Sequence, residues 1–187
     1  MARTPSNMLE LGTKAPEFTL IDTITEQEMS INNIKGDTAT VVMFICNHCP
    51  FVKHVNDELV RLGNDYKDKG IGFVAISSND VENYPDDSPG LMKIVAQELE
   101  YPFPYLYDET QEVAKAYDAA CTPDFYVFDK NLKLVYRGQL DDSRPGNDIP
   151  VTGKDLRSAL NALIDGKEVS DDQKPSLGCN IKWKQPV

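Results

Sequence analysis

Residues 40–77 read TVVMFICNHCPFVKHVNDELVRLGNDYKDKGIGFVAIS, in which two apolar runs flank a stretch with helical spacing. The runs at 40–45 and 71–77 are short and rich in β-branched residues, which is typical of strands buried on both faces. Between them, apolar side chains recur every three or four residues up to Gly70, which predicts an amphipathic helix. A strand, a helix and a second strand in this order form a βαβ unit with a right-handed crossover.

The alternation of strands and helices continues towards the C-terminus. Helices are expected at 89–99, 109–118 and 152–166, and strands at 104–107, 124–129 and 133–138, of which the last two form a hairpin. A capping box between Thr152 and Asp155 is expected to open the last helix. The order predicts an α/β fold with a central mixed sheet, helices on both faces and an N-terminal extension. We divide the chain into a domain, 1–166, and a C-terminal tail, 167–187, that packs on the domain or extends from it.

Composition limits the classes of partner. The length of 187 residues fits one domain, and no apolar run reaches the roughly 18 residues of a membrane-spanning helix. With 19 basic and 30 acidic residues the net charge is −11, which opposes binding to nucleic acid or to a membrane. The acidic surpluses at 80–87 and 141–148 are interpreted as solvated loops. The first residues lack the apolar core of a secretory signal, so we expect a cytoplasmic protein.

Cys46 and Cys49 form a CxxC pair where the first strand meets the helix. CxxC beside a βαβ unit indicates redox chemistry, in which a thiolate is the attacking group. A helix N-terminus offers unpaired N–H donors and a partial positive charge, both of which favour the anion. We therefore expect Cys46 to be exposed, with a pKa below the ordinary value of about 8.5, and Cys49 to be shielded. His48 lies between them and is expected to stabilise the Cys46 thiolate.

Two other interpretations of the CxxC pair stay open. The two cysteines are inert buried side chains in the first, and half of a zinc site in the second. A zinc site normally shows another CxxC or paired histidines at ligand spacing. The chain offers only His48 and His54, so redox chemistry is the preferred interpretation.

The CxxC unit and the segment Cys121-Thr122-Pro123 before the strand DFYVFD resemble the thioredoxin-like superfamily. The resemblance covers residues 9–166. It implies that Pro123 is a cis-proline packed against the CxxC and that it shapes a substrate groove with Thr122. The opening LGTKAPEFTL resembles the redoxin branch, the alkyl hydroperoxide reductase and thiol-specific antioxidant (AhpC/TSA) type. The stretches CNHCPFVKH, AACTPDFYVFD, YRGQLDDSRPGN and GCNIKW resemble a peroxiredoxin-like group of bacterial thioredoxin-family proteins.

The chain departs from these families at positions that matter for chemistry. Peroxiredoxins carry Pro-x-x-x-Thr/Ser-x-x-Cys. With Cys49 as the reactive cysteine, Cys46 occupies the hydroxyl position and Val42 the proline position; with Cys46 as the reactive cysteine, these positions are Met43 and Ala39, so neither register fits. The expected arginine is replaced by Thr122, so peroxidase activity of the usual kind is not expected. The buried acid that accepts a proton in thioredoxin falls at Thr40.

These features predict a thiol–disulfide oxidoreductase in which Cys46 attacks and Cys49 resolves. Its partners are protein or small-molecule thiols and disulfides and an electron donor that the sequence does not identify. No cofactor or metal is expected besides the redox-active cysteines, and the chain is expected to be a monomer or a weak homodimer. The alternatives are a peroxiredoxin-like thiol peroxidase with antioxidant activity and a non-enzymatic redox sensor or binding module.

The two remaining cysteines allow more than one role. Cys121 lies two residues before Pro123 and is either a resolving cysteine for Cys46 or a buried small residue. Cys179 lies in the polar tail, where an inert residue is the default and a redox partner for Cys46 or Cys121 is the alternative.

Overall fold

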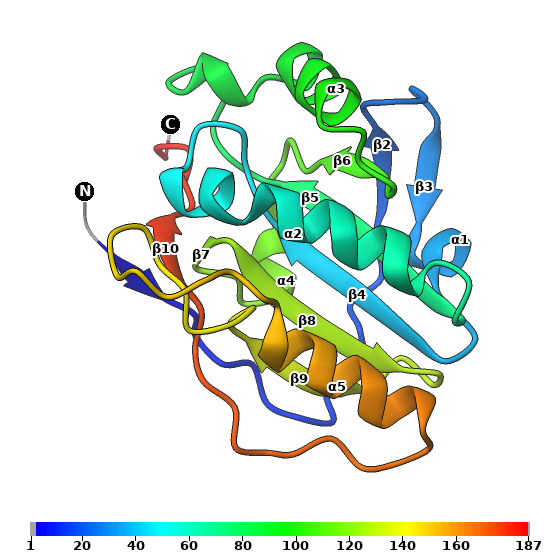
Figure 1. The fold of residues 1–187 in the computed structure, drawn as a ribbon. Helices are drawn as coiled ribbons and strands as arrows, with labels where there is room; N and C mark the ends of the chain where they lie inside the picture. Colours follow the sequence, from blue (N-terminus) through cyan, green and yellow to red (C-terminus); the bar gives the residue numbers. More distant parts are fainter. Residues whose placement is uncertain (1–2, 187) are drawn as a thin grey trace.

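The computed structural model describes residues 3–186 and contains a mixed seven-stranded sheet (Figure 1). Its strands lie in the order β3 (Glu28–Ser30), β2 (Thr19–Asp22), β6 (Tyr105–Tyr107), β5 (Ile71–Ser77), β4 (Ala39–Phe44), β8 (Asp124–Asp129) and β9 (Leu134–Gly138). The central pair, β4 and β5, is parallel, as the βαβ unit requires. The hairpin of β8 and β9 is antiparallel, as predicted.

Helices cover both faces of the sheet, which confirms the predicted fold class. They are α1 (Ile31–Ile34), α2 (Pro50–Tyr66), α3 (Pro89–Glu98), α4 (Glu112–Ala116) and α5 (Lys154–Ile164), with a short 3-10 helix η1 (Pro85–Asp87) before α3. Side chains alternate along a strand, so the sheet has a hydrophobic core on each face. Val41 and Met43 of β4 pack in the core beneath α2, α3 and α5. Val42 and Phe44 pack in the other core, beneath α1 and α4. In Figure 1, α2 and α5 lie on the same face of the sheet.

Three helices begin later than predicted, among them α4, which starts at Glu112 rather than at 109. The helix α2 starts at Pro50 with Cys49 as its N-cap, so Cys46 lies before the helix rather than at its end. The helix α5 starts after Gly153, which has a left-handed φ of 67°. The predicted capping box is wrong, because the N–H groups of Thr152 and Gly153 donate to Asp141 Oδ2 at 2.8 and 2.7 Å.

A second, three-stranded sheet joins the tail to the domain. The strand β10 (Leu177–Asn180) lies between β1 (Thr4–Pro5) and β7 (Cys121–Thr122), antiparallel to both. Beyond β10, the N–H of Ile181 donates to the carbonyl oxygen of Ala120 at 3.1 Å. The N–H of Lys182 donates to Asn79 Oδ1 at 2.9 Å. The tail therefore packs beside β7 near the start of α2, where Figure 1 shows it in red.

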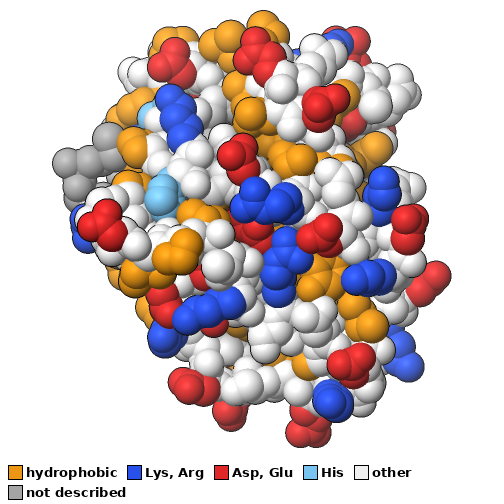
Figure 2. Space-filling model, in the orientation of Figure 1, with side chains coloured by type: hydrophobic (Ala, Val, Ile, Leu, Met, Phe, Trp, Pro, Cys, Tyr) orange, Lys and Arg blue, Asp and Glu red, His pale blue; other side chains and the backbone are white. Residues whose placement is uncertain are grey.

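Charged side chains do not gather into a patch of one sign on the face that α2 and α5 cover. Figure 2 shows acidic and basic groups interspersed there, and Arg157 pairs with Glu58 at 2.6 Å and with Asp65 at 2.8 Å. The interpretation of both acidic surpluses as solvated loops is wrong for Asp80, Asp87 and Asp141, which are 3%, 0% and 1% exposed. Within residues 3–186, no helix has the length and apolar character needed to cross a membrane.

Candidate active site

The four cysteines meet around the turn between β4 and α2. Cys46 and Cys49 belong to this turn, Cys121 to β7 and Cys179 to β10. Their exposed fractions are 2%, 0%, 0% and 1% in that order. The expectation that Cys46 is an exposed thiol is therefore wrong. Burial excludes water from these thiols, and a buried charge depends on the donors that face it.

The segment before β8 lies against the CxxC turn, as the resemblance implied. The Thr122-Pro123 peptide bond is cis. Cys46 Sγ lies 3.5 Å from Thr122 Oγ1, and Cys49 Sγ lies 3.3 Å from the Thr122 carbonyl oxygen. Thr122 and Pro123 are buried, and Thr122 is paired with Cys179 of β10. In this structure the tail strand thus covers the positions expected to shape a substrate groove.

Cys46 and Cys49 share a hydrogen bond, and their pKa values move in opposite directions. That hydrogen bond is the largest of the causes that lower the pKa of Cys49 to about 5; contacts with Cys179 and the N–H of Val52 act in the same direction, against burial. The same bond, burial and the Asp87 carboxylate raise the pKa of Cys46 well above its ordinary value. These directions favour a thiolate on Cys49, whereas the sequence-based prediction placed it on Cys46. The N-cap position of Cys49 contributes through the N–H of Val52, but the hydrogen bond with Cys46 is the larger cause.

A buried carboxylate holds the two residues between the cysteines. Asp87 Oδ1 accepts the N–H groups of Asn47 at 2.8 Å and His48 at 3.2 Å. Its Oδ2 accepts Asn79 Nδ2 at 2.8 Å and lies 2.5 Å from His48 Nδ1. The His48 ring thus contacts Asp87, where the prediction placed it against the Cys46 thiolate. Sequence reasoning missed Asp87 because nothing in an acidic loop segment separates a buried aspartate from a solvated one.

Cys46, His48 and Asp87 also bring three potential metal-ligand atoms within 4.8 Å of one another. A thiolate, an imidazole and a carboxylate are a set that zinc accepts. Both Asp87 oxygens, however, already accept N–H donors, and the second histidine, His54, lies 2.7 Å from Ser143 Oγ through its Nε2. We therefore assign the cluster to positioning of the CxxC turn rather than to metal binding.

Of the two other cysteines, Cys179 rather than Cys121 contacts the CxxC. Cys179 Sγ lies 2.7 Å from Cys49 Sγ. Cys121 Sγ donates to the carbonyl oxygen of Pro123 at 3.8 Å, and burial raises its pKa far above the ordinary range. The structure thus gives the tail cysteine a partner that the sequence did not suggest.

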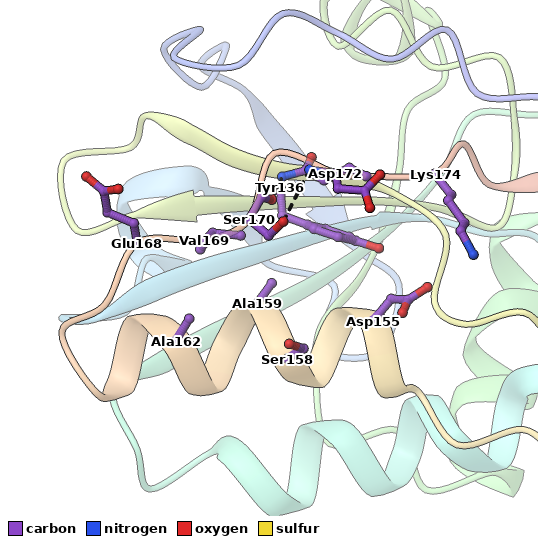
Figure 3. Close-up of a pocket in the computed structure, with 11 residues that line it drawn as sticks. Tyr136, Asp155, Ser158, Ala159, Ala162, Glu168, Val169, Ser170, Asp172 and Lys174 are labelled. Atoms are coloured by element: carbon purple, nitrogen blue, oxygen red, sulfur yellow. Dashed lines mark hydrogen bonds between the residues drawn. The ribbon is translucent and has the colours of Figure 1, made fainter.

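A cavity of about 380 Å³ lies away from these thiols, between α5, β9 and residues 168–174 (Figure 3). Ala159 and Ala162 of α5 form one wall, and Tyr136 and Lys174 contribute to the others. No cysteine or histidine is among the described residues that line it. The cavity therefore lacks the thiol and imidazole groups that gather at the CxxC turn.

The assignment of the thiolate predicts how reduced protein titrates. We expect thiolate absorbance near 240 nm to rise by one step around pH 5, because Cys49 has a pKa of about 5. Cys49→Ser should remove this step, whereas Cys46→Ser should keep it, because a serine hydroxyl still donates to Cys49. Asp87→Asn should lower the pKa of Cys46 by removing a nearby negative charge. Cys121→Ala is the matched control and should leave the step in place; loss of the step in Cys46→Ser alone would put the thiolate on Cys46.

Comparison with known proteins adds a family and a fold. The model of the AhpC/TSA family matches residues 11–137. An uncharacterized conserved protein from Geobacillus kaustophilus is 65% identical, with a TM-score of 0.98 over 100% of this chain and 99% of that one. A hypothetical protein from Sinorhizobium meliloti 1021 is 45% identical, with a TM-score of 0.95 over 98% and 100%.

A more distant structure shows the fold. The thioredoxin domain of a thiol-disulfide oxidoreductase from Bacteroides vulgatus is 24% identical, with a TM-score of 0.59 over 72% of this chain and 91% of that one. No curated protein matches the chain. The fold is thus thioredoxin-like, as the sequence predicted.

Proposed function

Because the chain belongs to the AhpC/TSA family and has a thioredoxin-like fold, we propose that it is a thiol–disulfide oxidoreductase with Cys46 and Cys49 as its redox-active dithiol. The observation that carries this proposal is the placement of the CxxC pair at the start of α2, with both sulfurs against Thr122 of the cis Thr122-Pro123 bond. The lowered pKa of Cys49 supports it. Thiolate rather than thiol is the form that attacks disulfides and accepts protons. The buried thiolate also supplies a base that Thr40, at the position of the thioredoxin acid, does not provide.

In the proposed reaction Cys46 faces the substrate and Cys49 acts first as a base. As Cys46 attacks a substrate disulfide, its proton passes to the Cys49 thiolate along their hydrogen bond. A mixed disulfide forms on Cys46, and one substrate sulfur leaves as a thiolate, which takes the proton from Cys49. The Cys49 thiolate then attacks Cys46 Sγ, releases the second substrate sulfur and closes the Cys46–Cys49 disulfide. An external thiol or dithiol donor returns this disulfide to the reduced form.

His48 and Asp87 are positioning residues in this proposal. Asp87 fixes the backbone of Asn47 and His48, and its charge keeps the proton on Cys46 until a substrate arrives. Cys46 is only 2% exposed, so the site has to open before a disulfide can reach it. A small disulfide needs a smaller opening than a protein disulfide. We place this activity in the cytoplasm, in a monomer or weak homodimer.

A thiol peroxidase is the second candidate, and one observation favours it. Cys49 is an N-cap thiolate with a hydrogen bond from the residue three positions earlier, where peroxiredoxins place a hydroxyl. Arg137, which follows β8, does not replace the activating arginine, because it donates to the Leu9 carbonyl oxygen at 2.7 Å and to Gln173 Oε1 at 2.9 Å. Thiol–disulfide exchange needs no such arginine and is therefore the preferred function.

Two assays on the same protein separate the candidates. With dithiothreitol as donor, we expect faster reduction of insulin disulfides and of oxidised glutathione than in the donor-only control. Consumption of hydrogen peroxide with the same donor should stay near the control rate. Fast peroxide turnover with slow disulfide reduction would replace the proposal by the peroxidase, and the absence of both activities would leave a redox sensor or binding module.

A further inference from the structure

The tail brings a third sulfur to the redox pair through backbone pairing. The strand β10 lies antiparallel to β7 with Cys179 opposite Thr122. Gly178 makes this approach feasible, because a Cβ at that position would lie 1.9 Å from the Thr122 carbonyl oxygen. A residue with a side chain would push β10 away from β7. The dipeptide Gly178-Cys179 is therefore suited to place a thiol against the CxxC turn.

The contact made by Cys179 is with Cys49. Their sulfurs lie 2.7 Å apart, and both residues are at most 1% exposed. A disulfide bond measures about 2.05 Å, so the two sulfurs need to approach by less than roughly 1 Å. Cys49 also shares a hydrogen bond with Cys46. One sulfur thus has two neighbours with which it can form a disulfide.

We propose that Cys179 is a second resolving cysteine, which attacks Cys49 Sγ in the Cys46–Cys49 disulfide and releases Cys46. The inference rests on the proposed function, which supplies that disulfide. The Cys49–Cys179 bond forms as the Cys46–Cys49 bond breaks, and the proton of Cys179 passes to Cys46. One disulfide and one thiol are present before and after the step, so no oxidant or reductant is consumed.

Oxidation of the CxxC pair favours this step. In the reduced protein the pKa of Cys179 is raised to about 12. Burial is the larger cause, and the contact with Cys49 is the next. Once Cys49 is part of a disulfide it carries no charge, so its contribution to that increase disappears. Cys179 then ionises more readily when its target is present.

The exchange has a consequence for turnover. Cys46 becomes a thiol again while the oxidising equivalent stays in a buried disulfide between β10 and α2. The electron donor then has to reduce a bond that ties the tail to the domain. The tail strand is therefore a functional part of the site in addition to covering it.

Peptide mapping of oxidised protein tests the exchange. Wild-type protein is oxidised with diamide, a reagent that converts neighbouring thiols to disulfides without enzymatic activity. It is then quenched with acid, blocked with an alkylating reagent and digested without reduction. We expect both Cys46–Cys49 and Cys49–Cys179, in a ratio that does not depend on protein concentration. Complete alkylation of Cys179 in the oxidised wild type would overturn the inference.

Three variants sharpen the result. Cys179→Ser should contain only Cys46–Cys49 and should lose all alkylation of Cys46. Cys46→Ser, oxidised in the same way, should form Cys49–Cys179. Cys121→Ala removes a buried thiol that donates to the Pro123 carbonyl oxygen, and it should show the wild-type pattern. If Cys179→Ser fails to fold, the mapping of the wild type and of Cys46→Ser still decides the question.

Failure of the inference differs from failure of the proposed function. A wild type that does not reduce insulin or oxidised glutathione, yet forms Cys49–Cys179 after diamide, keeps the sulfur exchange and removes the enzyme. A wild type that reduces both substrates but forms only Cys46–Cys49 keeps the enzyme and removes the role of Cys179.

Discussion

Cys46→Ser is expected to lower disulfide reduction to the rate of the dithiol donor alone. Serine at this position cannot form the mixed disulfide, and the three remaining thiols, Cys49, Cys121 and Cys179, are at most 1% exposed. Cys49→Ser should also lose turnover, but for another reason: Cys46 still attacks, and the mixed disulfide stays. Incubation with oxidised glutathione followed by intact-mass measurement should show one added glutathione in Cys49→Ser and none in Cys46→Ser.

The pH dependence of that trapped adduct tests the role of Cys49 as base. In Cys49→Ser, Cys46 has to ionise by itself, and burial and Asp87 still raise its pKa above the ordinary value. The rate of adduct formation should therefore rise steeply with pH in the alkaline range. The double variant Cys49→Ser with Asp87→Asn should move this rise to lower pH. An adduct that forms on Cys49 in Cys46→Ser, at a wild-type rate, would reverse the two roles.

The sequence was sufficient to predict the framework of the site but not its charge. The run at 40–77 predicts β4, α2 and β5, because apolar periodicity reports directly on burial. The resemblance placed Pro123 against the CxxC, which the cis bond and the contacts of Thr122 bear out. The protonation of Cys46 and Cys49, in contrast, depends on burial and on contacts with Asp87 and Cys179, which no local sequence pattern reveals.

The site residues that the sequence did not predict share one property: each lies far along the chain from the residue that it contacts. Asp87 lies 39 residues from His48, and Cys179 lies 130 residues from Cys49. No local pattern brings such residues together; the contacts arise from η1 beside the CxxC turn and from β10 beside β7. A cysteine in a polar tail and an aspartate in an acidic loop therefore look unremarkable until the tertiary structure is known.

Asp124→Asn is expected to remove a pH dependence of several kcal/mol from the free energy of unfolding. Asp124 opens β8 directly after Pro123 and is 0% exposed, and burial raises its pKa to about 8 against the hydrogen bond from Tyr126. In the unfolded chain its pKa is near 3.8. Between these values the folded protein holds a proton that the unfolded chain has lost, so the free energy of unfolding falls as pH rises.

The size of this fall follows from the difference in pKa. At about 1.36 kcal/mol per pKa unit, it is on the order of 5 kcal/mol between pH 4 and pH 8, and the dependence ends above the folded pKa. Asparagine does not titrate, so the variant should gain stability relative to wild type across this window and differ least near pH 4. Urea unfolding at a series of pH values measures the difference.

Asp142→Asn is the matched control for Asp124→Asn. The pKa of Asp142 is lowered, first by its hydrogen bond with Lys154, so its contribution to stability is lost only as pH falls below its ordinary value of 3.8. Between pH 5 and pH 8 its stability curve should run parallel to that of wild type. If the Asp124→Asn curve also runs parallel to that of wild type in this range, Asp124 is ionised in the folded protein. The buried region of Cys49, Cys121 and Cys179 then holds the charge of Asp124 in addition to a thiolate.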